Sequence, residues 1–145
     1  TCMEVTEVVL RSLFGALYDQ NVMLEGTILK ASMVISGKDC PEQASVEEVA
    51  EMTVRCLKSA VPAILPGIVF LSGGQSDEAA TAHLNAMNQM GPHPWPLSFS
   101  YGRAMQAAAL KIWSKDLVGN VAAAQQTVYA RAKDNGLAAL GQWKK

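Results

Sequence analysis

Gly67-Ile68-Val69-Phe70-Leu71-Ser72-Gly73-Gly74 is the stretch of sequence that best indicates the fold. Its apolar residues follow one another without the polar alternation expected of a strand that has one face in water. An apolar run of this kind, bounded by glycine, is typical of a strand covered on both faces, as in parallel sheets flanked by helices. The sequence therefore predicts a buried strand at residues 67–71, followed by a turn.

Two further stretches predict strands on either side of this run. Residues 22–30 are mostly apolar, with Glu25-Gly26 in the middle, and predict a buried strand that ends at Lys30. Residues 97–101 predict a third strand. Each predicted strand is followed by a polar or glycine-containing segment and then by a helical pattern, so the same unit is expected three times along the chain.

Apolar residues recur at helical spacing between and around these strands. Helices are predicted at about residues 4–19, 45–61, 76–90, from 103 onward, and 120–135. The predicted inner faces are Val5, Val9, Leu13 and Leu17 in the first helix, Val46, Val49, Thr53, Cys56 and Leu57 in the second, Ala80, Leu84 and Met87 in the third, and Met105, Ala108, Ala109 and Ile112 in the fourth. Ser45 and Glu48 have the spacing of a capping box. Ser76 is expected to cap the third helix, and Gly136 is expected to end the last helix in a left-handed conformation.

This alternation of strands and helices predicts an α/β fold with a parallel sheet. A doubly wound sheet would carry a glycine-rich nucleotide turn after its first strand, and none follows Lys30. A TIM (β/α)8 barrel places functional side chains at the carboxyl ends of its strands, where Lys30, Ser72 and Arg103 are predicted to lie. Because a complete barrel needs about 250 residues, we expect residues 1–145 to be the C-terminal part of a single TIM-barrel domain, with the N-terminal strands outside this sequence.

Composition and charge argue against several classes of partner and site. The chain has 12 Lys and Arg against 13 Asp and Glu, for a net charge of −1, so we expect no nucleic acid and no membrane surface as partner. Cys2, Cys40 and Cys56 form no C-x-x-C pair, and His83 and His93 have no ligand at metal-binding spacing, so no metal is expected. With no apolar span and no secretory signal at its start, the chain is expected to be cytoplasmic, an organelle form remaining open.

Lys30 is the candidate nucleophile. Between Ile28-Leu29 and Met33-Val34, its amine is expected in an apolar pocket, where the ammonium form is poorly solvated and the neutral amine attacks carbonyl groups. The alternative is a lysine whose stem lies along the barrel rim with its charge in water.

Two glycine-containing segments are candidates for binding an anion. Ser72-Gly73-Gly74 follows one predicted strand and precedes a helix, so backbone N–H groups and the helix N-terminus would face a phosphate. Ser100-Tyr101-Gly102-Arg103 repeats this arrangement one unit later and adds a guanidinium that suits two phosphate oxygens. The alternatives are a plain tight turn at Gly73-Gly74 and a solvated arginine at the helix surface.

Three long segments in register resemble class I fructose-1,6-bisphosphate aldolases. Residues 24–34 resemble the segment that carries the family's Schiff-base lysine, and residues 70–76 and 99–104 resemble its two phosphate-binding segments; the likeness continues through Leu84–Asn88 and Pro94-Trp95 to the last helix. Two departures are visible. Ala31-Ser32 stands where the family often has Pro-Asn, and the tyrosine-ended tail of animal members is absent from this sequence.

The resemblance implies a lyase of glycolysis and gluconeogenesis that needs no cofactor and acts on a sugar phosphate. It implies that Lys30 forms the imine and that the substrate-binding residues are Ser72, Gly73, Ser100, Tyr101, Gly102 and Arg103. It also implies a homo-oligomer, a tetramer in the family, and a glutamate base that would lie before Thr1. Two alternatives stay open: a binding or scaffold protein built on the same fold, and another Schiff-base barrel that acts on sugar phosphates.

Overall fold

The computed structural model describes residues 1–144 and contains a parallel three-stranded sheet with helices packed against it. The elements, in chain order, are α1 (Cys2–Asp19), a 3-10 helix η1 (Leu24–Gly26), β1 (Leu29–Ala31), α2 (Val46–Ala60), β2 (Ile68–Phe70), α3 (Asp77–Gln89), β3 (Leu97–Phe99), α4 (Arg103–Trp113) and α5 (Val121–Ala139). The predicted α/β class and the repeated strand-helix unit are confirmed.

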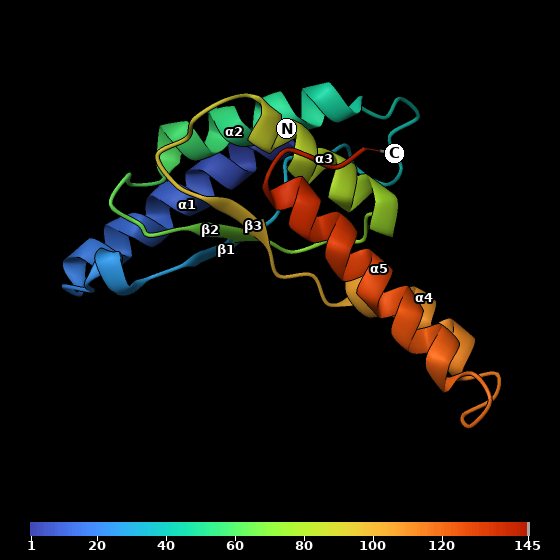
Figure 1. The fold of residues 1–145 in the computed structure, drawn as a ribbon. Coiled ribbons are helices and arrows are strands. Elements are labelled where there is room, and N and C mark those ends of the chain that lie inside the picture. Colours follow the sequence, from blue (N-terminus) through green and yellow to red (C-terminus); the bar gives the residue numbers. More distant parts are fainter. Residues whose placement is uncertain (145) are drawn as a thin grey trace.

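The sheet has the order β1-β2-β3, with both pairs parallel. Its register aligns Lys30 with Val69 and Ser98 across the three strands. Helices α1, α2 and α3 lie together on one side of the sheet, while α4 and α5 run side by side and project away from it (Figure 1). Side chains that face the helices form the core, and Ile68, Phe70, Leu84 and Met87 have no exposed surface.

Helix starts agree closely with the predictions from capping residues. The Ser45 hydroxyl accepts the Glu48 N–H, and the Glu48 carboxylate accepts the Ser45 N–H, which completes the predicted capping box at α2. The Ser76 hydroxyl accepts the Ala79 N–H at the start of α3. Each bond satisfies a backbone donor that has no partner within the helix.

The predicted inner face of α1 was wrong. Val5, Val9 and Leu13 are exposed, whereas Leu10 and Phe14 are buried and Leu17 is half-buried. Helix α1 is apolar on more than one side, so a spacing of four residues does not by itself select the side that meets the sheet. In α4, similarly, Ala109 is buried as predicted but Ala108 is exposed.

The strand predicted over residues 22–30 is much shorter than expected. Leu24–Gly26 form a turn of 3-10 helix, and the strand covers only Leu29–Ala31, so Lys30 lies in its middle rather than at its end. The apolar residues upstream serve other purposes: Leu24 is buried in the core, while Met23 and Ile28 are exposed. The other two strands are each trimmed to three residues within their predicted ranges.

Helix α5 does not end at Gly136 as predicted. It continues to Ala139, and the glycine with left-handed backbone is Gly141, at φ 67°. The run Leu137–Leu140 keeps apolar residues available to the core after Gly136, and Ala138 is fully buried. Packing therefore extends the helix past a residue that would otherwise favour its end.

Alanine substitutions at these two glycines should change stability in opposite directions. At Gly136, inside the helix and with nothing within 4 Å of an added β-carbon, alanine should raise the free energy of unfolding by about 0.5–1 kcal/mol. Gly141 has a left-handed backbone, and a β-carbon there would lie 3.2 Å from the Asn88 carbonyl carbon. Alanine at Gly141 should therefore lower the free energy of unfolding by about 1–2 kcal/mol. Urea unfolding of the intact protein measures both, and changes of equal sign would contradict this description of the helix end.

Candidate active site

The loops that follow the three parallel strands all begin at the carboxyl end of the sheet. The Leu71 N–H donates to the Ala31 carbonyl at 3.0 Å, and the Ser100 N–H donates to the Phe70 carbonyl at 2.8 Å. These bonds continue the parallel pairing one step beyond the strands, so Ser72 and Ser100 begin their loops from neighbouring positions. The loops that carry Ser72 and Ser100 therefore lie side by side at the carboxyl ends of the strands.

Lys30 lies on the face of the sheet opposite the helices. Its neighbours in the strand, Leu29 and Ala31, are buried in the core, and strand alternation sends the Lys30 side chain the other way. Beside it in register are Val69 and Ser98, both half-buried. Lys30 itself is exposed, so residues 1–144 do not form the apolar enclosure predicted for its amine.

The loop Ser72–Gln75 turns tightly after β2. The Gln75 N–H donates to the Ser72 carbonyl at 3.0 Å, and Gly73 and Gly74 have φ of 57° and 81°. Both angles lie in the left-handed region that glycine adopts without steric cost. Ser72 is buried, whereas both glycines are exposed, so the glycine backbone is the accessible part of this loop.

Arg103 links the two predicted phosphate segments. It is the first residue of α4, directly after the N-cap residue Gly102, which has no side chain to occupy the helix N-terminus. Its Nη2 atom lies 3.9 Å from the position that a β-carbon on Gly74 would occupy. The guanidinium therefore reaches the loop after β2, and the two segments meet at Gly74.

The side chain of Tyr101 lies in the core. It is buried, and its hydroxyl donates to the Ala80 carbonyl in α3 at 2.9 Å. Burial raises the pKa of Tyr101 well above its ordinary value. The hydroxyl is thus directed into the core, so a contact of Tyr101 with a substrate would involve its backbone.

Sequence reasoning missed Gln75, which ties the loop after β2 to its surroundings. Its side-chain amide donates to the Met33 sulfur at 3.6 Å, and its carbonyl oxygen lies 2.5 Å from His83 Nδ1 on α3. Burial lowers the pKa of His83, an effect that Glu47 partly opposes. A neutral ring that donates through Nδ1 fits this contact. The sequence carries no signal for the contact between Gln75 and Met33, because these residues are 42 positions apart along the chain.

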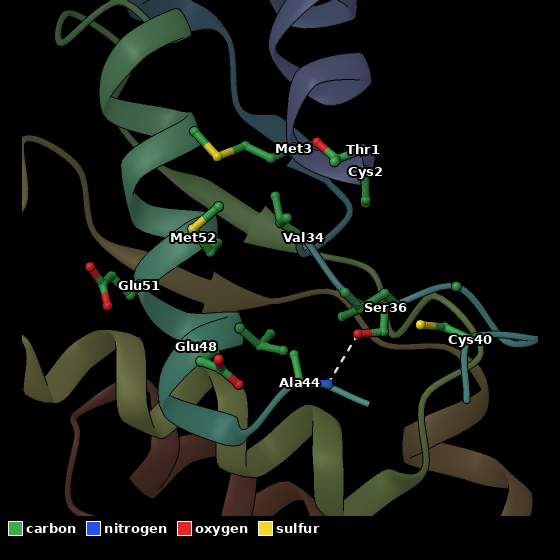
Figure 2. A pocket seen from close by; sticks show the side chains of 13 residues that line it. Thr1, Cys2, Met3, Val34, Ser36, Cys40, Ala44, Glu48, Glu51 and Met52 are labelled. Carbon is green, nitrogen blue, oxygen red and sulfur yellow. Dashed lines mark hydrogen bonds between the residues drawn. The ribbon is translucent and has the colours of Figure 1, made fainter. Parts of the chain in front are cut away.

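The remaining features of residues 1–144 add no metal or membrane element. No group of three His, Cys, Asp or Glu side chains within this range lies close enough together to hold a metal ion. None of the helices in the same range is long and apolar enough to cross a membrane. A cavity of ≈ 660 Å³ lies between the start of α1, the segment after β1 and the start of α2 (Figure 2), and none of the predicted site residues lines it.

Comparisons with known proteins agree with this geometry. A family model described as "Glycolytic: Fructose-bisphosphate aldolase class-I" matches residues 1–145. Over 144 residues the chain is 80% identical to a probable fructose-bisphosphate aldolase class 1 of Xanthomonas campestris, covering 99% of this chain and 43% of that protein. It is 58% identical to fructose-bisphosphate aldolase 1 of Toxoplasma gondii over 142 residues, 98% of this chain and 39% of the relative.

A solved structure also matches the fold. The fructose-bisphosphate aldolase of Plasmodium falciparum, in complex with TRAP and a small-molecule inhibitor, superposes with a TM-score of 0.95 at 47% identity. The match covers 99% of this chain and 41% of that one. The chain therefore spans about two fifths of the length of these relatives, and its three parallel strands and helices correspond to a portion of the aldolase barrel.

Proposed function

Because this chain belongs to the class I fructose-bisphosphate aldolase family, we propose that the intact protein cleaves fructose 1,6-bisphosphate to dihydroxyacetone phosphate and glyceraldehyde 3-phosphate, and catalyses the reverse condensation. The observation that carries the proposal is the 80% identity to a class 1 aldolase over 144 residues. The meeting of Arg103 and Gly74 beyond the carboxyl ends of the strands, in the sheet whose first strand carries Lys30, supports it.

Lys30 is the proposed nucleophile. Its neutral amine attacks the C2 carbonyl of the substrate, and loss of water gives a protonated imine. The imine withdraws electrons from the C3–C4 bond, so that bond breaks while a base takes the proton from the C4 hydroxyl. The electron pair remains on the Lys30 adduct as an enamine, which is protonated at C3 and then hydrolysed. We expect the base to be a glutamate outside residues 1–145.

The Gly74 loop and Arg103 are the proposed phosphate site. The guanidinium offers parallel N–H donors to two phosphate oxygens, while Ser72, Gly73, Ser100 and Gly102 contribute backbone or hydroxyl groups around it. These residues would hold the substrate by its phosphate and present the ketone to Lys30. Their contribution is orientation, which makes the attack effectively intramolecular.

We also propose that the protein works in the cytoplasm as a homotetramer. The support is the family resemblance and the near balance of acidic and basic residues. Analytical ultracentrifugation of the intact protein would give the mass of a tetramer, whereas a monomer or dimer would contradict the proposed assembly.

Aldol cleavage by the intact protein tests the proposed function directly. The purified protein should release triose phosphates from fructose 1,6-bisphosphate in a coupled assay, and should consume them in the reverse direction. An absence of turnover in both directions, with the protein folded, would contradict the proposal and favour a binding role for this fold.

Arg103→Ala should weaken substrate binding far more than it slows the imine chemistry. Each charge-assisted hydrogen bond to phosphate contributes about 1.5–3 kcal/mol, so KM for fructose 1,6-bisphosphate should rise about tenfold to a hundredfold with a smaller change in kcat. Steady-state kinetics measure the two constants. Lys111→Ala, an exposed cation on the same helix α4, is the control and should leave KM unchanged. An unchanged KM in Arg103→Ala would remove Arg103 from the phosphate site.

A further inference from the structure

Lys38 lies beside Arg103 at the proposed phosphate loop, although it belongs to a different part of the chain. It is an exposed residue of the loop between β1 and α2. Its Cε and Nζ atoms lie 3.6 and 3.8 Å from the position of a Gly74 β-carbon, the same position that is 3.9 Å from Arg103 Nη2. Two cations, from two different loops, therefore flank one exposed glycine.

Neither Lys38 nor Arg103 forms an ion pair within residues 1–144. The ion pairs in this range are Thr1 with Glu4 and Arg11 with Glu7, both in α1 or at its start. Like charges at short range repel unless a counter-charge lies between them. A doubly charged anion bound at Gly74 would supply that counter-charge.

Lys38 is not needed to hold its own loop. The Cys40 N–H donates to the Gly37 carbonyl at 3.1 Å, the Gln43 amide donates to the same carbonyl at 3.0 Å, and the Ala44 N–H donates to the Ser36 hydroxyl at 3.0 Å. None of these bonds uses the Lys38 side chain. Its position over Gly74 therefore has no evident structural purpose within the loop, and its replacement should leave the backbone in place.

We propose that Lys38 is a second phosphate-binding cation, which selects ketone substrates that carry a phosphate. This inference rests on the proposed aldolase function and adds a residue to its phosphate site. Arg103 binds two oxygens through its planar fork, and Lys38 adds a compact charge that can reach a third. In this proposal Lys38 contributes to binding of the phosphate and not to formation of the imine.

The test compares phosphorylated and unphosphorylated ligands on the intact protein. Lys38→Ala should weaken the binding of inorganic phosphate, measured by calorimetric titration, about threefold to tenfold, because an exposed cation is partly screened by water. KM for fructose 1,6-bisphosphate should rise by the same factor, with kcat changed less than twofold. Borohydride trapping of dihydroxyacetone, which has no phosphate, should be unchanged.

Two further variants serve as controls. Lys38→Arg keeps the charge and should retain phosphate affinity within about twofold. Lys133→Ala removes an exposed lysine from the middle of α5 and should bind phosphate as the unmodified protein does.

The outcomes separate the two proposals. Phosphate affinity that is the same in Lys38→Ala as in the unmodified protein would overturn the role of Lys38 and leave the aldolase function standing. If Lys38→Ala reduced borohydride trapping of dihydroxyacetone as much as it reduced phosphate affinity, the role of Lys38 would also be overturned, since Lys38 would then act on the imine. If the unmodified protein neither cleaves the bisphosphate nor traps either ketone, the aldolase function itself fails.

Discussion

Lys30→Met should reduce cleavage of fructose 1,6-bisphosphate by the intact protein to the background rate, a loss of at least about a thousandfold. Methionine keeps the length of the side chain and removes the amine, so no imine forms. The Lys30 side chain is exposed and forms no ion pair within residues 1–144, so the fold should not depend on it. Circular dichroism and phosphate binding should therefore be preserved while turnover is lost.

Lys133→Met is the matched control for this loss. It makes the same chemical change at an exposed position of α5, and its activity should equal that of the unmodified protein. Cleavage by Lys30→Met at more than a few per cent of the normal rate would show that another group carries the covalent step.

Residues 1–145 expressed alone should aggregate or remain molten, and should show no aldol cleavage. The sheet β1-β2-β3 has an unpaired edge on each side, and open edges pair with other chains. Its face opposite the helices is uncovered (Figure 1), and Val5, Val8 and Ile28 are each more than 60% exposed, at 63%, 67% and 61%.

The energies involved explain why this effect should be large. Burying one large apolar side chain contributes about 1.5–3 kcal/mol, while the net stability of a whole domain is only about 5–15 kcal/mol. Leaving several of them in water should therefore exceed the margin. Size-exclusion chromatography, dye binding and urea unfolding of the piece and of the intact protein provide the comparison. A soluble 145-residue monomer that unfolds cooperatively would contradict this account of the partial barrel.

Local signals in the sequence predicted the fold well where one residue type decides the structure. Ser45 with Glu48, and Ser76, marked two helix starts because their side chains satisfy backbone donors next to them in the chain. The run 67–71 predicted β2 because a short apolar run bounded by glycine is typical of a strand in a parallel sheet. Parallel pairing followed from the alternation of strands and helices.

The errors arose where several local structures have similar energies. In those places the packing of the whole core selects the buried side of a helix or the residue at which it ends. In α1, Val5 and Leu10 lie on different sides of an apolar helix, and only contact with the rest of the core distinguishes them. At Gly136 the loss of helix propensity, about 1 kcal/mol, is small beside the burial gained by continuing to Ala138. The hydrogen bond from the Tyr101 hydroxyl to α3 is a further contact that the sequence does not reveal.

The sequence predicted which residues belong to the candidate site, but it did not predict which of their side chains approach one another. Arg103, Gly74 and Lys30 were expected at one edge because parallel strands end together. The approach of Lys38 to Gly74, and the bridge from Gln75 to Met33, join segments more than 30 residues apart in the first case and 42 in the second. Such contacts depend on how two loops fold over each other, which no periodicity in the sequence encodes.

The most direct measurement of the central claim is to trap the imine. The intact protein is incubated with dihydroxyacetone phosphate, reduced with borohydride, digested and analysed by mass spectrometry. The account predicts one stable adduct, on the peptide that contains Lys30, and none in Lys30→Met. An adduct on a different lysine, or no adduct from a folded protein that still cleaves the bisphosphate, would contradict the assignment of Lys30 as the Schiff-base residue.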